Sequence, residues 1–569
     1  MANFDLIVVG AGLHGIAASR FYLDINPKCR LAILEEDTCV GGVWSSSRLY
    51  NGFWSQSGLR MAGFSDTPLT LPPEAETYHD IFEAKYVTKY LEDYVDSHKY
   101  NGLTLRDRVK FGFKVESIRK EGKWRVSGQR NDKVETIWSS KLVVATGHTS
   151  LPVMPDLPEQ ARFKGPVLHQ KSFGKASSTI LASSSSYHNV TILGGGKSAA
   201  DMVYDSVKAG KTVSWIIRQT GEGPAAFAGA AGKGPYKNGP EIAATRMICA
   251  LSPSCFSPVT WWTKTIHGSE YGRKLIAKIW LGADQACRDL AKFQSREGAR
   301  PGFEKLESTT AIFWCTGPIG MIQHEDFWDT IAKNVSVYRS DIRAMRPNSI
   351  VLKDGSEIES DVLFCGTGWS RHYPFLAKDQ IVEFGLPHAP EDEEDAEESS
   401  KWENLLKAAD HQVIAQFPQL AHPPPHFERP TNITATRLYN CIAPLEDKTI
   451  AFLGDIDLSN SFRTAEAQAI WLTAYFDGRV ELPPREEAEK EIAYMAAFSK
   501  RRYPSHGATG NYFHMDLIGY TDKLMKDVGL VSHRKGWWQD LVSPCLASDF
   551  KGIREEYLSK FGLAVEKDS

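Results

Sequence analysis

The sequence predicts an α/β protein with two doubly wound, Rossmann-like dinucleotide-binding domains, one inserted in the other. A strand-like run at 5–9 leads into G-A-G-L-H-G at 10–15, and a second run at 190–193 leads into G-G-G-K-S-A at 194–199. The segment F-K-G-P-V-L-H-Q-K-S-F lies between them at 163–173. A strand, a glycine turn and a helix start together form the fingerprint of a dinucleotide pyrophosphate site.

The composition limits the class of protein. A chain of 569 residues is long enough for two or three domains, and its net charge of −4 gives no reason to expect a nucleic-acid partner. The nine cysteines are scattered without a C-x-x-C pair, which argues against a flavin disulfide reductase and against a metal site. The scattered cysteines also favour reduced thiols and hence a cytoplasmic protein, and no run of about 18 apolar residues is present, so we expect no transmembrane segment.

The first fingerprint has the features of an FAD site. Gly10, Gly12 and Gly15 allow a tight turn and let backbone N–H groups approach a pyrophosphate at a helix N-terminus. A second strand-like run at 30–34 is followed by Glu35, at the spacing where an acid accepts hydrogen bonds from ribose hydroxyls. The alternative is a glycine-rich turn with an unrelated surface acid.

The second fingerprint has a cation where the first has an acid. Gly194, Gly196 and Ser198 lie in its turn, and the strand-like run at 212–217 ends at Arg218. An arginine suits the 2′-phosphate of NADPH, because its guanidinium makes paired, charge-assisted hydrogen bonds. The second site is therefore predicted to bind NADPH, with a plain surface arginine as the alternative.

The segment between the fingerprints carries a family resemblance. Its pattern F-x-G-x-x-x-H-x-x-x-F resembles the linker of the class B flavin monooxygenases, the flavin-containing monooxygenase and Baeyer–Villiger group. Phe173 resembles the flavin-containing monooxygenase branch, since Baeyer–Villiger enzymes usually carry tryptophan there. The chain looks most like the oxygenases of fungal secondary metabolism.

The resemblance implies roles for residues near the flavin. The run G-G-V-W at 41–44 is similar to the family's G-G-x-W along the flavin, which assigns Gly42 and Trp44 to cofactor binding. The loop at 55–68 resembles one that ends in F-S-D-x-P, and it places Gln56 where the family has an asparagine beside the reactive edge. Gln56 is thus a candidate catalytic amide, or else an ordinary loop glutamine.

Three further residues follow from the same resemblance. His169 of the linker is a candidate for proton transfer or, alternatively, a structural residue at a domain junction. The late strand-like run at 448–455 ends at Asp455, and the helical run at 465–471 contains Gln468. In the family this strand and this helix approach the flavin, so both residues are assigned to cofactor binding.

The resemblance also implies a domain plan. The FAD-binding domain comprises 1–173 and 361–569, and the NADPH-binding domain comprises 174–360 with a helical insertion at about 221–308. We expect the tryptophans of the insertion to pack inside it. The alternatives are an insertion that covers the active site and one that touches a membrane surface. We expect a surface loop from Gly174 to Ser186.

The function implied is that of an FAD-dependent NADPH monooxygenase. NADPH reduces FAD, O2 reacts at the flavin C4a atom, and the resulting (hydro)peroxyflavin oxygenates a small apolar metabolite. One alternative is Baeyer–Villiger oxygenation of a ketone, which needs a cation to hold the peroxide anionic. Arg339, Arg343 and Arg346 lie in the right part of the chain, but the sequence places none of them. The other is an NADPH oxidase or reductase flavoprotein that inserts no oxygen. The sequence leaves open whether the protein is a homodimer.

Overall fold

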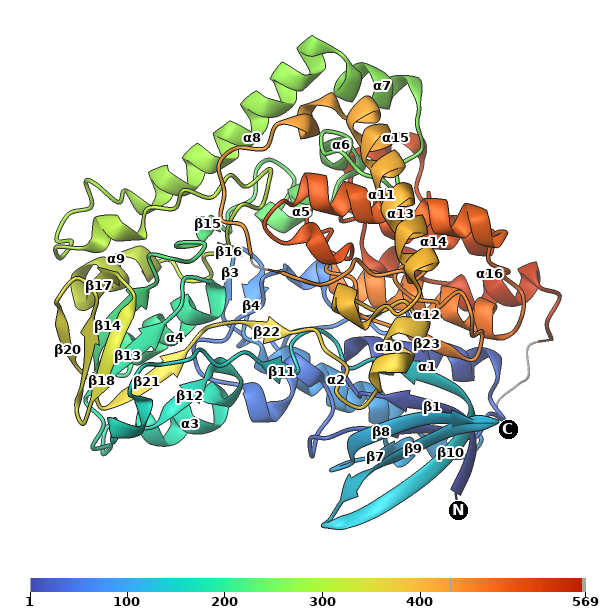
Figure 1. The fold of residues 1–569 in the computed structure, drawn as a ribbon, viewed down its shortest axis with the longest axis horizontal. Helices are drawn as coiled ribbons and strands as arrows, with labels where there is room; N and C mark the ends of the chain where they lie inside the picture. Colours follow the sequence, from blue (N-terminus) through green and yellow to red (C-terminus); the bar gives the residue numbers. More distant parts are fainter. Residues whose placement is uncertain (1, 430, 565–569) are drawn as a thin grey trace.

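The molecule contains two large β-sheets, which are formed mainly by separate parts of the chain (Figure 1). The computed structural model describes residues 2–429 and 431–564. The first sheet has the order β7-β2-β1-β10-β9-β8, and β23 pairs with β10. Its strands are β1 (Ala2–Val9), β2 (Leu31–Leu34), β7 (Val109–Lys110), β8 (Lys114–Glu121), β9 (Lys123–Arg130), β10 (Lys133–Val144) and β23 (Ile450–Phe452).

The parallel part of the first sheet aligns the ends of four strands. In the register, Val9 lies opposite Leu34 and Val144, and Val144 lies opposite Phe452. Burial on both faces fits the continuous Val, Ile and Leu runs of these strands. The residues that follow the four strands therefore meet at one edge, where open α/β sheets bind ligands.

The second sheet is parallel throughout, with the order β12-β21-β13-β14-β17. Its strands are β12 (Val167–His169), β21 (Val362–Cys365), β13 (Asn189–Leu193), β14 (Thr212–Ile217) and β17 (Val335–Arg339). Leu193 lies opposite Ile216 and Cys365, and Ile217 lies opposite Arg339. This sheet therefore also has one carboxyl edge, and that edge carries the second glycine turn.

Smaller sheets accompany the two large ones. An antiparallel sheet follows β17 and contains β18 (Ile342–Arg346), β19 (Ser349–Leu352) and β20 (Glu357–Glu359). Four strand pairs complete the set: β3 (Thr77–Tyr78) with β4 (Ile81–Phe82), β5 (Lys99–Tyr100) with β6 (Leu103–Thr104), β11 (Leu151–Pro152) with β22 (Trp369–Ser370), and β15 (Ala226–Ala228) with β16 (Ile319–Met321).

Helices pack on the sheets and form a further helical region beside them (Figure 1). Early helices are α1 (Leu13–Ile25), α2 (Lys85–Ser97), α3 (Phe173–Ile180), α4 (Lys197–Lys208), α5 (Gly239–Ala243), α6 (Arg246–Cys249), α7 (Trp261–Gly268), α8 (Glu270–Ala291) and α9 (Phe327–Asn334). Later helices are α10 (Lys378–Glu383), α11 (Ala396–Gln416), α12 (Ser461–Phe476), α13 (Arg485–Arg502), α14 (Gly519–Val528), α15 (Trp537–Val542) and α16 (Ile553–Lys560). α1 packs against α12, which joins the beginning of the chain to its late part.

The prediction of a surface loop from Gly174 to Ser186 is wrong in its first half. α3 runs through Ile180, and Phe173, Ile180 and Leu181 are buried in the core of the second sheet. These apolar residues stabilise a helix here through packing, which the serines in the sequence obscured.

The expectation for the tryptophans at 221–308 is also wrong for two of them. Trp261 is 77 % exposed and Trp262 is 48 % exposed. Both lie in the first turn of α7, whose buried residues are Ile266 and His267. Trp280 is the one that packs inward, with its ring centroid 5.7 Å from that of Phe313.

Within the described residues, no helix combines the length and the apolar character needed to cross a bilayer. The same residues contain no group of three or more His, Cys, Asp or Glu side chains arranged to hold a metal ion.

Candidate active site

The first glycine turn joins β1 to α1, and each of its three glycines has a different surrounding. Gly10 has a φ of +106°, and a β-carbon there would lie 2.5 Å from the carbonyl oxygen of Ala145. A β-carbon at Gly15 would lie 1.9 Å from the carbonyl oxygen of Gly10. At Gly12 it would meet only the Cα atom of Gly42, at 3.7 Å. The backbone therefore packs tightly against Gly10 and Gly15 and leaves no room for a side chain, whereas the space beside Gly12 is open to a ligand.

The N-terminus of α1 fits an anionic group. No side chain caps this helix, and its first turn contains no acidic residue, so its first N–H groups remain free to donate. Glu35 lies beside the turn, accepting hydrogen bonds from Ala11 N at 2.7 Å and Asp37 N at 2.9 Å. Burial raises the pKa of the Glu35 carboxyl. The uncapped helix and the fixed acid fit the pyrophosphate and ribose of FAD.

Trp44 is fixed by contacts with two residues, Phe53 and Thr88. Its ring stacks on Phe53 with a centroid distance of 5.3 Å and an interplanar angle of 3°. The Thr88 hydroxyl donates a hydrogen bond to the Trp44 carbonyl oxygen at 2.5 Å. The preceding Gly42 lies against the first turn, since its β-carbon would be 3.2 Å from Gly12. Gly42 and Trp44 thus adjoin the predicted FAD site.

Asp455 and Gln468 meet the end of β23 in different ways. Asp455 accepts hydrogen bonds from the Tyr373 hydroxyl and from the Asn511 side chain, both at 2.8 Å. The Gln468 amide oxygen accepts from Gly454 N at 3.1 Å, and its nitrogen donates to the Tyr520 hydroxyl at 2.9 Å. Both polar atoms of Gln468 are engaged by the protein, which fixes the turn that precedes Asp455, and its contact with the cofactor stays a prediction.

Asp455 also lines a cavity of about 1010 Å³. Most of the other walls come from the segment after β22, from α11 and α13, and from residues 423–429, 431–435 and 504–512. This volume lies at the upper end of the range of small-molecule pockets, about 300–1,000 Å³. The cavity therefore provides space for an organic substrate next to the first sheet's carboxyl edge.

The second glycine turn has the same features as the first: a tightly packed glycine, an open one and a helix without a side-chain cap. Gly194 has a φ of +139°, and a β-carbon there would lie 2.3 Å from the carbonyl oxygen of Gly366. At Gly196 a β-carbon would meet only Pro318, at 3.9 Å. α4 begins after Gly196 without a side-chain cap and without an acid in its first turn. Ser198 is half-buried in that turn, and among the described residues its hydroxyl has no hydrogen-bond partner.

The far end of this edge carries two arginines, one of which the sequence analysis did not assign. Arg218 is exposed at the end of β14. Arg339 ends the neighbouring strand β17, and its Nη1 atom is buried without a hydrogen-bond partner among the described residues. That atom lies 3.3 Å from where a β-carbon of Gly223 would stand, and burial lowers the pKa of Arg339. A guanidinium with one buried, unpaired nitrogen, on the strand next to the one that leads to Arg218, fits a phosphate group of NADPH.

The two glycine turns are connected through α4. The Tyr50 hydroxyl donates to Asp201 at 3.3 Å, and Gly52 N donates to Asp205 at 3.2 Å. Burial raises the pKa of both carboxyls, that of Asp205 to about 6. The segment that follows Trp44 is thereby attached to the helix that starts at the second turn.

A second connection reaches the neighbourhood of Gln56. The Lys197 ammonium donates to Asp201 and to the Gln323 amide oxygen. The Gln323 amide nitrogen donates to the carbonyl oxygens of residues 54 and 55, both at 2.7 Å. The Gln56 side chain itself is exposed, with no polar partner among the described residues. Its catalytic role stays a prediction, but its backbone is anchored to the second fingerprint.

His169 uses both ring nitrogens for backbone contacts. Lys171 N donates to Nδ1 at 3.1 Å, so Nε2 carries the proton and donates to the Gly368 carbonyl oxygen at 2.9 Å. Its ring also packs edge-on against Trp369. Burial lowers the pKa of His169, which keeps the ring neutral. These contacts join β12 to the segment after β21, and they favour the junction role over proton transfer.

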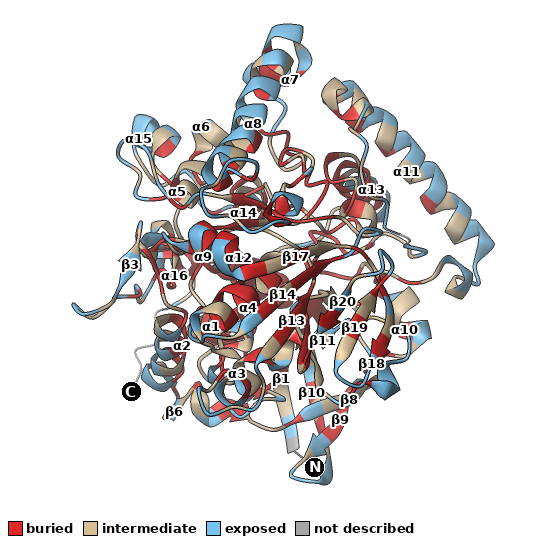
Figure 2. Cartoon of the chain, turned by 90° about the vertical axis from the view of Figure 1, so that its left-hand side faces the viewer, coloured by how far each residue is buried: buried red, intermediate tan, exposed pale blue. Residues whose placement is uncertain are grey.

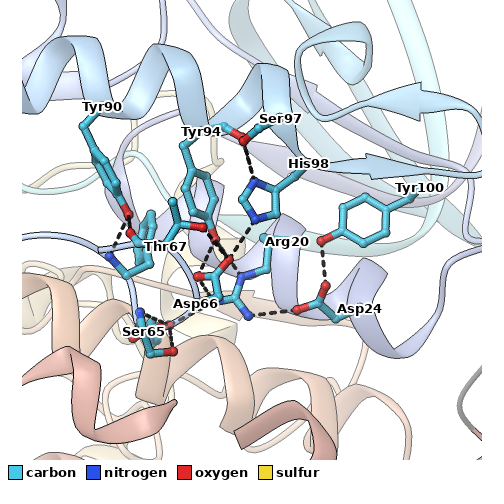
Figure 3. Close-up of polar contacts among 12 residues, drawn as sticks. Arg20, Asp24, Ser65, Asp66, Thr67, Tyr90, Tyr94, Ser97, His98 and Tyr100 are labelled. Atoms are coloured by element: carbon cyan, nitrogen blue, oxygen red, sulfur yellow. Dashed lines mark hydrogen bonds and ion pairs between the residues drawn. The ribbon is translucent and has the colours of Figure 1, made fainter. Parts of the chain in front are cut away.

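Arg20 lies at the centre of a buried network of charged side chains (Figure 3). Arg20 of α1 forms ion pairs with Asp24 at 2.8 Å, with Asp66 at 2.9 Å and with Glu466 of α12 at 2.9 Å. The Ser65 hydroxyl donates to Glu466 at 2.7 Å. The network therefore fixes α1, whose N-terminus forms the turn, relative to α12 and the loop that follows Gln56.

Known proteins resemble this chain in sequence and in fold. A family model described as L-lysine 6-monooxygenase/L-ornithine 5-monooxygenase matches residues 80–226. The FAD-dependent monooxygenase DEP4 of Fusarium langsethiae is 30 % identical, over 98 % of this chain and 95 % of that protein. The FAD-dependent monooxygenase rstn6 of Aspergillus nomiae is 29 % identical, over 98 % of this chain and 99 % of that protein.

A solved structure, cyclohexanone monooxygenase from Rhodococcus sp. Phi1 bound to NADP+, has a TM-score of 0.58. It is 16 % identical and covers 93 % of this chain and 97 % of that one. At this identity the likeness concerns the fold.

Proposed function

Because this chain belongs to the FAD-dependent monooxygenases of the class B flavin group, we propose that it uses NADPH and O2 to oxygenate a small apolar metabolite. The observation that carries this proposal concerns the two glycine turns. Each turn follows a parallel strand and leads into a helix, α1 or α4, whose N-terminus has no side-chain cap. The contacts Tyr50–Asp201 and Gly52–Asp205 attach the segment after Trp44 to α4, the helix that starts at the second turn. Two adjacent dinucleotide sites are what hydride transfer from NADPH to FAD requires.

The chain's own groups bind and orient the reactants. FAD supplies the chemistry of oxygen activation when it is bound and reduced. We infer that residues 1–173 and 361–569 hold FAD and that residues 174–360 hold NADPH. Glu35 orients the ribose of FAD, and the N-terminus of α1 holds its pyrophosphate.

The cavity beside Asp455 is the proposed place of the substrate. It is lined by five cationic side chains and three carboxylates, and also by apolar groups such as Trp369, Leu406 and Ile433. Tyr373 and Asn511 fix the carboxylate of Asp455, so it stays at the cavity wall. Gln56 is proposed to contribute its amide on the side of the second fingerprint, where residues 54 and 55 are anchored.

The purified protein is expected to be yellow and to release FAD on denaturation, because the first turn offers only non-covalent contacts. Mass spectrometry of the released flavin measures this directly. Oxidation of NADPH under labelled O2, with candidate apolar substrates, then shows whether one labelled oxygen atom enters the product. Release of FMN, or a product without label, would contradict the proposal.

Arg218→Ala and Arg339→Ala are each expected to weaken the binding of NADPH roughly tenfold to a hundredfold, since hydrogen bonds to charged groups contribute about 1.5–3 kcal/mol. NADH should change little, because it lacks the 2′-phosphate. The measurement is the hydride-transfer rate against the concentration of each nucleotide.

Arg343→Ala is the matched control for these variants. Arg343 is exposed on β18, close in sequence to Arg339 but beyond the end of β17. The Arg343→Ala variant should bind both nucleotides as the wild type does. Equal losses of NADPH and NADH in the Arg218 or Arg339 variant would mean that the arginine supports the fold and does not contact the phosphate.

A further inference from the structure

The segment 257–282, which contains α7 and the first half of α8, exposes a group of large apolar side chains. α7 and the first turns of α8 lie at the upper end of the molecule (Figures 1 and 2), and α8 then runs down to the second sheet, whose core contains Ala291. The exposed fractions are 56 % for Val259, 77 % for Trp261, 48 % for Trp262, 79 % for Tyr271 and 66 % for Leu281. Large aromatic residues are seldom exposed in such a group unless the surface binds something.

The helix that carries these tryptophans is firmly attached to the protein. A capping box formed by Thr260 and Thr263 starts α7. Ile266 and His267 are buried on its inner side, where the His267 ring lies 3.2 Å from the Ala250 carbonyl oxygen. α7 also contacts α11 and the turn Pro418–Ala421. The tryptophans are therefore presented outward by an ordered scaffold.

The charge around these aromatic residues is strongly positive. Residues 257–282 contain four cations and a single acid, although the whole chain has a net charge of −4. Glu270 pairs with Lys274, while Lys264, Arg273 and Lys278 have no ion-pair partner among the described residues. On α8 the exposed residues Tyr271, Lys274, Lys278 and Leu281 recur at the helical period and form one stripe.

We propose that residues 257–282 form a docking surface for an anionic phospholipid membrane. Trp and Tyr rings prefer the interface between headgroups and acyl chains, because they are apolar with one polar atom. Lysine and arginine stems extend along the apolar layer and place their charges among anionic headgroups. The surface lies on the membrane and does not span it, which agrees with the amphipathic pattern of α8.

The same surface is linked to the cavity. α11 contacts α7, and its residues Leu406, Lys407 and Asp410 line the cavity. A membrane-docked protein would therefore present this wall near the lipid, where apolar metabolites accumulate. The docking itself does not depend on the proposed oxygenation, so each can be tested separately.

The test is flotation of the full-length protein with vesicles. Vesicles of phosphatidylcholine and phosphatidylserine in equal parts are expected to bind the protein at low salt, and vesicles of phosphatidylcholine alone to bind it much less. Trp261→Ser/Trp262→Ser should weaken binding at least about tenfold. Lys264→Gln/Lys278→Gln should weaken it roughly twenty-fivefold, since each cation near such a surface contributes about fivefold.

The matched control is Trp537→Ser/Trp538→Ser on α15. These tryptophans are 81 % and 57 % exposed, but the neighbouring cations Arg534 and Lys535 are paired with Glu556 and Asp549. This variant should bind vesicles as the wild type does. All variants should keep the wild-type melting temperature, because the substituted side chains are exposed.

Three results would overturn the proposal. The first is absence of vesicle binding by the wild type. The second is an equal loss in the α15 control, which would indicate unspecific adsorption of apolar residues. The third is a wild-type oligomer in solution that the Trp261 and Trp262 substitutions dissociate, which would show that a second copy of the chain covers this surface.

Discussion

Replacing Arg20 with methionine is expected to lower the free energy of unfolding by about 3–5 kcal/mol. The side chain is only 4 % exposed and pairs with Asp24, Asp66 and Glu466 (Figure 3). Methionine fills similar space but leaves the buried Glu466 carboxylate without its cation. The cost of an uncompensated buried charge exceeds that of the lost packing.

The loss should depend on pH in a defined direction. Burial raises the pKa of Glu466 to about 7, against an ordinary value of 4.5, and Arg20 opposes that shift. Without Arg20 the folded-state pKa moves higher still, so the folded variant binds a proton that the unfolded chain releases. The wild type itself loses stability between about pH 4.5 and 7, so the variant's deficit is smallest on the acidic side and grows as pH rises above about 7.

Urea unfolding at several pH values measures both effects. The control is Arg30→Met, because Arg30 and Asp5 form a surface pair at 2.7 Å with side chains 62 % and 45 % exposed. That pair should contribute less than about 1 kcal/mol. Adding Glu466→Gln to Arg20→Met should restore part of the stability. A loss in Arg20→Met no larger than the control's would contradict the assignment.

Gly15→Ala is expected to reduce FAD affinity by at least about a hundredfold, or to give a protein without flavin. The new β-carbon would lie 1.9 Å from the carbonyl oxygen of Gly10, so α1 must move away from the turn. Overpacking of this kind costs about 1–3 kcal/mol or more, and the displaced helix no longer points its N-terminus at the pyrophosphate. Flavin absorbance per mole of protein and titration of the apoprotein with FAD measure the loss.

Gly282→Ala is the matched control. Gly282 also lies within a helix, α8, but nothing stands within 4 Å of a β-carbon there. Alanine should leave flavin content unchanged and increase stability slightly, by about 0.5–1 kcal/mol. Normal flavin content in Gly15→Ala would show that α1 can shift without disturbing the site.

The two fingerprints could be predicted from the sequence because their physics is local. A strand, a turn that only glycine can form and a helix start occupy consecutive residues, and the structure places Gly10 and Gly194 at the ends of β1 and β13. The α/β class follows from the same local patterns. The domain boundaries and the roles of the site residues remain predictions.

What the sequence could not reveal depends on contacts between distant residues. Arg339 approaches Arg218 only because β17 pairs with β14 in the folded sheet. The exposure of Trp261 depends on which face of α7 meets α11, and an eight-residue helix with apolar residues on several sides does not decide this. Likewise, Gln468 appears as a ligand in the family pattern, but Gly454 and Tyr520 occupy its amide here.

The pairing of β23 with β10 has a consequence for the order of folding. All strands of the second sheet lie between residues 167 and 365, so this sheet can form during synthesis before the late part of the chain emerges. The first sheet must wait for residues 450–452, more than three hundred positions after β10. Closing so long a loop is slow. If the first nucleotide site includes the end of β23, as proposed, it should therefore be the last part of the protein to mature.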